Sequence, residues 1–186
     1  MKQKYQNTLG FIVLVILLSL LPLLLLAQDY SELGITKKVE AAVLYEICQA
    51  NSKLSVGGSQ VDNTFIKRWE NHFHTNTDVC ELKEVICNSN GLITALDLSN
   101  MELTKLPSSM QSLKHLERLY LHENELTELP SSLGNLDRLN ELTIFQNDLD
   151  NLDPKLRALC GISVVNGLDG NPVSRYMTWE EFCRGI

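Results

Sequence analysis

Apolar side chains recur at a fixed spacing between Ile93 and Leu159. Three segments of this stretch begin at Ile93, Leu116 and Leu139, so the pattern repeats every 23 residues. The L-x-L sequence in each segment predicts a short strand with alternating side chains, and the LP sequence that follows predicts a turn or short helix. Seven apolar positions recur in all three segments, and their side chains are the predicted core: Ile93, Leu96, Leu98, Leu103, Leu106, Met110 and Leu113; Leu116, Leu119, Leu121, Leu126, Leu129, Leu133 and Leu136; and Leu139, Leu142, Ile144, Leu149, Leu152, Leu156 and Leu159.

This spacing, L-x-x-L-x-L-x-x-N-x-L, resembles the leucine-rich-repeat family. Asn124 and Asn147 occupy the asparagine position of the second and third repeats, whereas Met101 occupies it in the first. The resemblance implies an α/β fold. It would be a short solenoid with a parallel β-sheet on its concave face, short helices or turns on its convex face, and helical N- and C-terminal caps. Asparagine side chains stacked from repeat to repeat would form a ladder of hydrogen bonds to the turns, and this ladder is predicted to be missing or shifted at Met101.

The N-terminal segment has the pattern of an export signal. Lys2 and Lys4 precede an apolar run from Leu9 to Ala27. A basic start, an apolar run and a small residue before a polar break describe a secretory signal peptide over 1–27, cleaved after Ala27. The run is also long enough for an uncleaved membrane anchor with the repeats outside. Both interpretations predict an extracellular protein, either secreted or single-pass.

Residues 28–92 are predicted to form an N-terminal capping region. Apolar residues at helical spacing predict one helix over 36–50, with its apolar face formed by Val39, Ala42, Val43, Tyr45, Ile47 and Cys48, and a second over 65–74 around Ile66, Trp69 and Phe73. Neither helix can bury its apolar face alone. We expect both to cover the end of the first of the three repeats, which span 93–159.

Two cysteines separated by six residues precede the first strand, as in the N-terminal cap of secreted plant-type and bacterial leucine-rich-repeat proteins. They are Cys80 and Cys87, and Val85 fits the apolar position of that cap. Leu82 and Glu84 replace its usual Trp and Gly. The resemblance implies a Cys80–Cys87 disulfide in an exported protein.

The last segment, 160–186, is predicted to be a C-terminal cap of the same family. Thr178 and Glu181 have the spacing of a capping box that starts a short helix. A Cys160–Cys183 disulfide is expected there, and Cys48 is then left over, either as a buried thiol or as half of an intermolecular disulfide. The alternative for this segment is an aromatic binding site at Tyr176 and Trp179.

The outward strand positions are the candidate protein-binding site. Alignment of the repeats places them in three rows: Ala95, Arg118 and Glu141; Asp97, Tyr120 and Thr143; and Ser99, His122 and Phe145. Aromatic and arginine side chains of this kind are typical of binding hot spots. The alternative is cross-strand packing, with Arg118 pairing Glu141. A protein partner is the first expectation, and a glycan stacked on Tyr120 and Phe145, or a membrane-anchored adhesion or receptor ectodomain, is the alternative.

Other functions are less favoured. A net charge of −7, which becomes −9 if Lys2 and Lys4 are removed with the signal, disfavours nucleic acid as a partner. A zinc site at Cys80, Cys87, His72 and His74 and a calcium site at Asp148, Asp150 and Asp153 lack the usual ligand spacings. No nucleophile–base pair or phosphate loop is recognisable, so we expect neither catalysis nor a cofactor.

Overall fold

The computed structural model describes residues 32–51, 64–74, 78–165 and 167–185. The segment predicted to be a signal peptide or anchor lies outside the described residues. The chain divides into two compact units, Met1–Lys38 and Val39–Ile186. Of the first unit, only the start of helix α2 (Glu32–Asn51) is described. The arrangement given below is that of the second unit.

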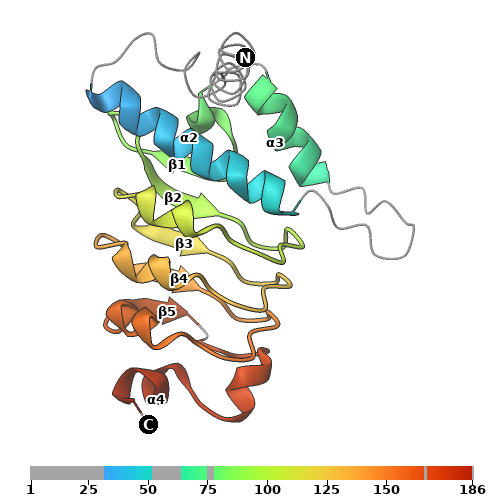
Figure 1. Cartoon of the computed structure of the whole chain (residues 1–186), viewed down its shortest axis with the longest axis vertical. Helices are drawn as coiled ribbons and strands as arrows, with labels where there is room; N and C mark the ends of the chain where they lie inside the picture. The colour runs from blue at the N-terminus through green and yellow to red at the C-terminus, as the bar shows by residue number, and fades with distance from the viewer. Residues whose placement is uncertain (1–31, 52–63, 75–77, 166, 186) are drawn as a thin grey trace, which may run out of the picture. The chain divides into compact units, whose positions relative to one another are not determined.

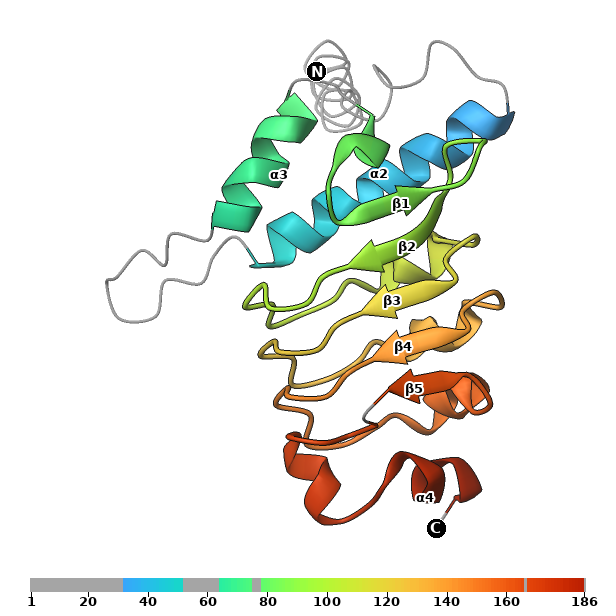
Figure 2. The same cartoon turned by 180° about the vertical axis from the view of Figure 1, so that it is seen from behind.

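One five-stranded sheet runs through this unit in the order β1-β2-β3-β4-β5. Strands β2 (Ile93–Asp97), β3 (Arg118–Tyr120), β4 (Glu141–Thr143) and β5 (Ser163–Val165) are parallel to one another. Strand β1 (Val85–Cys87) pairs with β2 in the antiparallel direction. Figures 1 and 2 show the strands stacked in sequence order, so the predicted parallel sheet is confirmed. The stack extends one parallel strand beyond the three aligned repeats.

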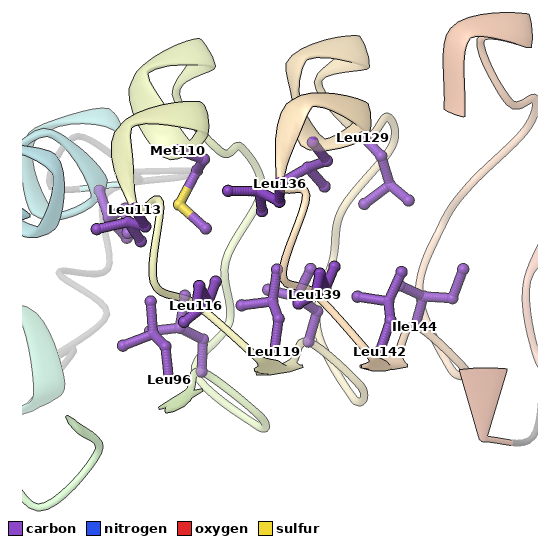
Figure 3. Packing of buried hydrophobic residues seen from close by; sticks show 14 of the residues in the cluster. Leu96, Met110, Leu113, Leu116, Leu119, Leu129, Leu136, Leu139, Leu142 and Ile144 are labelled. Atoms are coloured by element: carbon purple, nitrogen blue, oxygen red, sulfur yellow. The ribbon is translucent and has the colours of Figure 1, made fainter. Parts of the chain in front are cut away.

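Short 3₁₀ helices return the chain from the end of one strand to the start of the next. They are η2 (Ser108–Ser112), η3 (Ser131–Asn135) and η4 (Pro154–Leu159). Figure 3 shows the core between them and the sheet, with Met110 and Leu136 on the helical side and Leu119 and Leu142 on the side of the strands. The predicted core leucines are buried, except for Leu106 and Leu152, which are partly buried. Each Å² of apolar surface that this continuous core removes from water stabilises the stack by about 25 cal/mol.

A ladder of buried asparagine side chains stabilises the turns that follow the strands. The Asn124 Oδ1 atom accepts hydrogen bonds from the Met101 and Leu103 N–H groups at 3.0 Å, and Nδ2 donates to the Leu98 carbonyl at 2.8 Å. Asn147 and Asn171 repeat this arrangement in the next two turns. The ladder therefore begins at the second repeat, as the Met101 position predicted, and Asn171 continues it beyond the third.

Helix α2 covers the first repeat from Val39 onward, as expected of a cap. Its predicted apolar face is confirmed in part: Val43, Ile47 and Cys48 are buried. Val39 and Tyr45 are 42% and 40% exposed, and Ala42 is exposed as well. The buried stripe of α2 follows helical spacing and consists of Glu40, Val43, Leu44, Ile47, Cys48 and Asn51. Polar residues, Glu40 and Asn51, form both ends of this stripe, so the apolar pattern alone identified only its middle. At the far end, Asn51 accepts from the Thr104 N–H at 2.9 Å and donates to the Lys105 carbonyl at 3.0 Å.

Helix α3 (Thr64–His74) and the short helix η1 (Val79–Glu81) complete the N-terminal cap. The Trp69 indole Nε1 donates to the buried Glu84 carboxylate at 3.2 Å, and the Arg68 guanidinium pairs with the same group. Leu82 is buried as well. The turn in which Leu82 and Glu84 replace the Trp and Gly usual in this type of cap is therefore packed by Trp69 of α3. The predicted Cys80–Cys87 disulfide is present, with a Cα–Cα distance of 5.8 Å.

The C-terminal cap follows β5 and contains η5 (Pro172–Arg175) and α4 (Trp179–Arg184). The capping box predicted at Thr178 and Glu181 is formed, with reciprocal hydrogen bonds of 3.2 Å and 2.7 Å. Trp179 and Phe182 are buried against the last turn, and the predicted Cys160–Cys183 disulfide joins α4 to the stack. Burial of Trp179 gives it a structural role in place of the alternative aromatic site.

Candidate functional site

The candidate site is the side of the sheet that points away from the core, called here the open sheet face. The strand register places Ala95, Arg118, Glu141 and Ser163 in one row. A second row contains Asp97, Tyr120 and Thr143. These are the neighbours that the 23-residue alignment predicted. They lie on strands fixed by the core beneath them, so the spacing between their side chains is set by the fold rather than by a loop.

The third predicted row lies just past the ends of the strands. Backbone hydrogen bonds of 3.1 Å from Asn100 to His122 and from Glu123 to Phe145 hold these segments side by side. A further bond of 2.7 Å from the Gln146 N–H to the Asp169 carbonyl adds Asp169 to the row. Asp169 is an exposed acid in the C-terminal cap that the repeat alignment missed, because the spacing there differs from 23 residues.

The His122 and Phe145 rings stack on each other in this third row. Their centroids are 4.6 Å apart and their planes differ by 15°. The His122 Nδ1 atom also lies 2.8 Å from the Thr143 hydroxyl oxygen. Thr143 is only 4% exposed, so its side chain positions His122 instead of presenting a contact surface of its own. The stacked pair is half-buried, and its ring orientation is fixed before any partner arrives.

Tyr120 lies beside three charged residues. Burial raises the pKa of its hydroxyl above the ordinary value, and the Glu141 carboxylate raises it further, whereas Arg118 acts in the opposite direction. Asp97, its cross-strand neighbour on β2, also raises the pKa of Tyr120, but by less than Glu141 does. Within the described part of the chain, no ion pair shorter than 4.0 Å joins Arg118 to Glu141. The two side chains are neighbours in the row, but the alternative of a local Arg118–Glu141 pair is not realised.

The open sheet face continues onto β1, which the repeat pattern does not include. Ile86 pairs with Ala95, and its side chain is 52% exposed. Because Val85 faces the core opposite Leu96, alternation along the strand turns Ile86 toward the row of Arg118. Ala95 itself is 2% exposed. The first part of this row thus presents Ile86, not Ala95.

The alternative metal sites are not assembled. Cys80 and Cys87, which the zinc alternative required, form a disulfide. Asp153 accepts a hydrogen bond from the Lys155 N–H at the start of η4, while Asp148 and Asp150 are exposed. Among the described residues, no group of three His, Cys, Asp or Glu side chains is placed to hold a metal ion.

The fifth cysteine is isolated from solvent. Cys48 is a free thiol with no exposed surface. Burial raises its pKa to about 12, and the Glu70 carboxylate contributes to the rise. A protonated, enclosed thiol is a packing residue, in agreement with the first of the two interpretations of Cys48.

A hollow lies between α3 and the loop that contains η1. Its volume is about 440 Å³, and it is lined by Arg68, Asn71, His72, Glu81, Leu82 and Lys83. Three of its polar groups have partners within the cap: Arg68 and Lys83 pair with Glu84, and the His72 Nε2 atom lies 3.0 Å from the Asp78 carbonyl. None of the helices in the described part of the chain is long and apolar enough to span a membrane.

Comparison with known proteins supports the repeat assignment. The leucine-rich-repeat family model matches residues 92–149. No curated protein matches the chain. Among solved structures, a leucine-rich-repeat protein of Leptospira interrogans is 34% identical over 42% of this chain with a TM-score of 0.39, and the match spans 21% of that protein.

Two plant structures from Arabidopsis thaliana also match. A chain of the BIR3–SERK2 complex is 17% identical, with 71% of this chain and 81% of that chain covered and a TM-score of 0.42. The BIR2 ectodomain is 16% identical, with 77% and 82% covered and a TM-score of 0.37. Residues 92–149 are leucine-rich repeats, and the described structure is a short leucine-rich-repeat solenoid with helical caps.

Proposed function

We propose that this protein is an exported, non-catalytic recognition module that binds a protein partner through the open sheet face. Leucine-rich repeats often serve as protein-interaction modules. The observation that carries the proposal is the group of half-buried aromatic side chains, Tyr120, His122 and Phe145, which lies on adjacent segments together with Arg118. Aromatic and arginine side chains on a rigid support contribute most of the energy in protein interfaces.

Export is supported by the two disulfides, one in each cap. Disulfides persist in oxidising compartments and are rare in the cytosol. The basic and apolar N-terminal pattern that ends at Ala27 agrees with this assignment. Sequencing the N-terminus of the secreted product tests the cleaved form, because a mature chain that still begins at Met1 would instead support the anchor.

Site-specific photo-crosslinking tests the binding proposal. A photoreactive phenylalanine analogue replaces Tyr120 in one variant and Tyr176 in the control. Tyr176 is 83% exposed on the C-terminal cap, far along the chain from the open sheet face. Incubation with the native extracellular medium should give a defined protein adduct at position 120 and none at position 176. Equal labelling at both positions, or labelling at 176 alone, would refute the proposal.

Loss of the aromatic side chains provides an independent readout. Tyr120→Ala combined with Phe145→Ala should abolish capture of the crosslinked protein and leave the circular dichroism spectrum unchanged, because neither side chain belongs to the buried core. A glycan array probed with the unmodified chain and with this double variant tests the alternative ligand class, a glycan. Glycan binding that depends on Tyr120 and Phe145, without a protein adduct, would assign the site to a carbohydrate.

A further inference from the structure

Charge is distributed unevenly between the open sheet face and the rest of the repeats. Among the residues that the structure describes, the face carries the carboxylates of Asp97, Glu141 and Asp169 and one cation, Arg118. The stacked turns that follow the strands add further exposed acids: Glu102, Glu123, Glu125 and Asp148. The other basic residues of the repeats are Lys105, which follows the first of these turns, Lys114 and Arg138, which precede strands, and Lys155 and Arg157, which lie on η4. The open sheet face and its adjoining edge are therefore acidic, while the remaining faces are mixed.

The acids of the face lie next to its aromatic rings. Tyr120 is the cross-strand neighbour of Asp97, and Glu141 lies close enough to affect the pKa of its hydroxyl. Asp169 follows Phe145 in the same row. A lysine or arginine side chain placed over one of these rings would meet both the negative face of the ring and a carboxylate. Arg118 balances only one of the three carboxylates, so a cation is attracted to this surface.

The face also has an apolar end. Ile86 is more than half exposed and begins the row that contains Arg118 and Glu141. Five strands about 4.8 Å apart span about 19 Å, which is the length of an extended segment of about six residues. A bound segment that crosses the strands could thus contact Ile86, Tyr120 and Phe145 at the same time.

We propose that the occupant of the open sheet face is a basic segment of a protein partner, with lysine or arginine side chains facing Tyr120, Glu141 and Asp169 and an apolar side chain on Ile86. This inference rests on the proposed function and adds the chemistry of the partner. The acidic turns along the edge would attract such a segment from a distance and speed its association.

A displayed library of random peptides of about twelve residues, a length that exceeds the estimated span of the face, provides the first test. The library is selected on the full chain, and peptides that also bind the Tyr120→Ala/Phe145→Ala variant are discarded. The retained peptides should be rich in Lys and Arg and contain a large apolar residue. Acidic or neutral retained peptides, or none at all, would overturn the basic-segment inference, whereas the crosslinking at position 120 decides the proposed function separately.

Affinities of the best retained peptide provide the second test. The double variant Glu141→Gln/Asp169→Asn should bind it about fivefold more weakly than the unmodified chain, because exposed ion pairs contribute modestly. The matched control Asp137→Asn/Glu180→Gln removes the same charge from exposed positions off the face and should change the affinity less than twofold. The loss should be largest at about 50 mM salt and smaller at about 300 mM. Equal losses in both double variants would overturn the inference, since they would show attraction by net charge alone.

Discussion

The Glu40 carboxylate accepts a hydrogen bond from the Ile93 N–H at 2.9 Å and joins the cap helix α2 to the first parallel strand. In the following repeats, the equivalent N–H groups of Leu116 and Leu139 donate at 3.0 Å to the carbonyls of Leu113 and Leu136, the residues that follow η2 and η3. Ile93 begins the first repeat and follows β1 and its turn instead of a 3₁₀ helix. A glutamate side chain from α2 supplies the missing acceptor, so the cap completes the hydrogen bonding of the stack as well as its apolar packing.

Removal of this acceptor should destabilise the protein. Glu40→Ala leaves the buried Ile93 N–H without its acceptor, which costs about 2–3 kcal/mol of unfolding free energy. Glu40→Gln keeps an oxygen in position and should lose clearly less. Urea unfolding followed by circular dichroism measures both variants. Equal losses for the two would show that the hydrogen bond to Ile93 contributes little.

Gly170 should tolerate substitution far less than Gly185, although both have left-handed backbone angles. Their φ values are +75° and +77°. A Cβ atom on Gly170 would lie 2.9 Å from the Gln146 Cγ and 3.1 Å from its backbone, whereas on Gly185 the nearest atom, in Arg157, is 3.8 Å away. Gly185→Ala should cost about 1 kcal/mol from the backbone angle alone, and Gly170→Ala about 3 kcal/mol, because overpacking is added. Thermal unfolding compares them, and similar losses would rule out the close contact as the cause.

Cys48 should be unreactive in the folded protein. With its pKa raised to about 12 from 9.0, its thiolate is about a thousandfold rarer than in an ordinary cysteine near neutral pH. An aromatic disulfide reagent should therefore label no thiol in the native state and one thiol after unfolding in denaturant. The two disulfides stay intact in both conditions. Rapid native labelling, or a dimer band in non-reducing electrophoresis, would contradict this expectation.

The repeats were predictable because each rung has almost the same surroundings as the next. A residue such as Leu119 packs between its counterparts Leu96 and Leu142, so the 23-residue period specifies register, burial and strand direction together. The cap helix lacks such a constraint. Its buried stripe includes Glu40 and Asn51, whose side chains accept hydrogen bonds from backbone N–H groups of the first repeat. Apolar periodicity cannot identify such buried polar residues.

The repeat pattern predicted the strand register, and with it the face on which the residues of the candidate site lie. Alternation along the strands placed Arg118, Tyr120 and Phe145 on one face, but it could not show that Thr143 is buried beside His122. Ile86 was missed because β1 runs antiparallel and lies outside the repeat pattern. Its exposure depends on pairing with Ala95, a contact between segments that no local pattern specifies.

The ionisation of Tyr120 reports directly on the acids of the open sheet face. Burial and the Glu141 carboxylate raise its pKa above 10.0 in the folded protein, so the folded state keeps this proton at a pH where the unfolded chain has lost it. The associated stabilisation is present below about pH 10 and is lost as the pH rises through the folded-state pKa. Glu141→Gln should lower the Tyr120 pKa toward the ordinary value, and Asp97→Asn should lower it less. Magnetic resonance titration of isotope-labelled tyrosine rings resolves this group among the five tyrosines. A Tyr120 pKa that does not change in Glu141→Gln would show that the carboxylate is too far from the hydroxyl to contribute to a cation site.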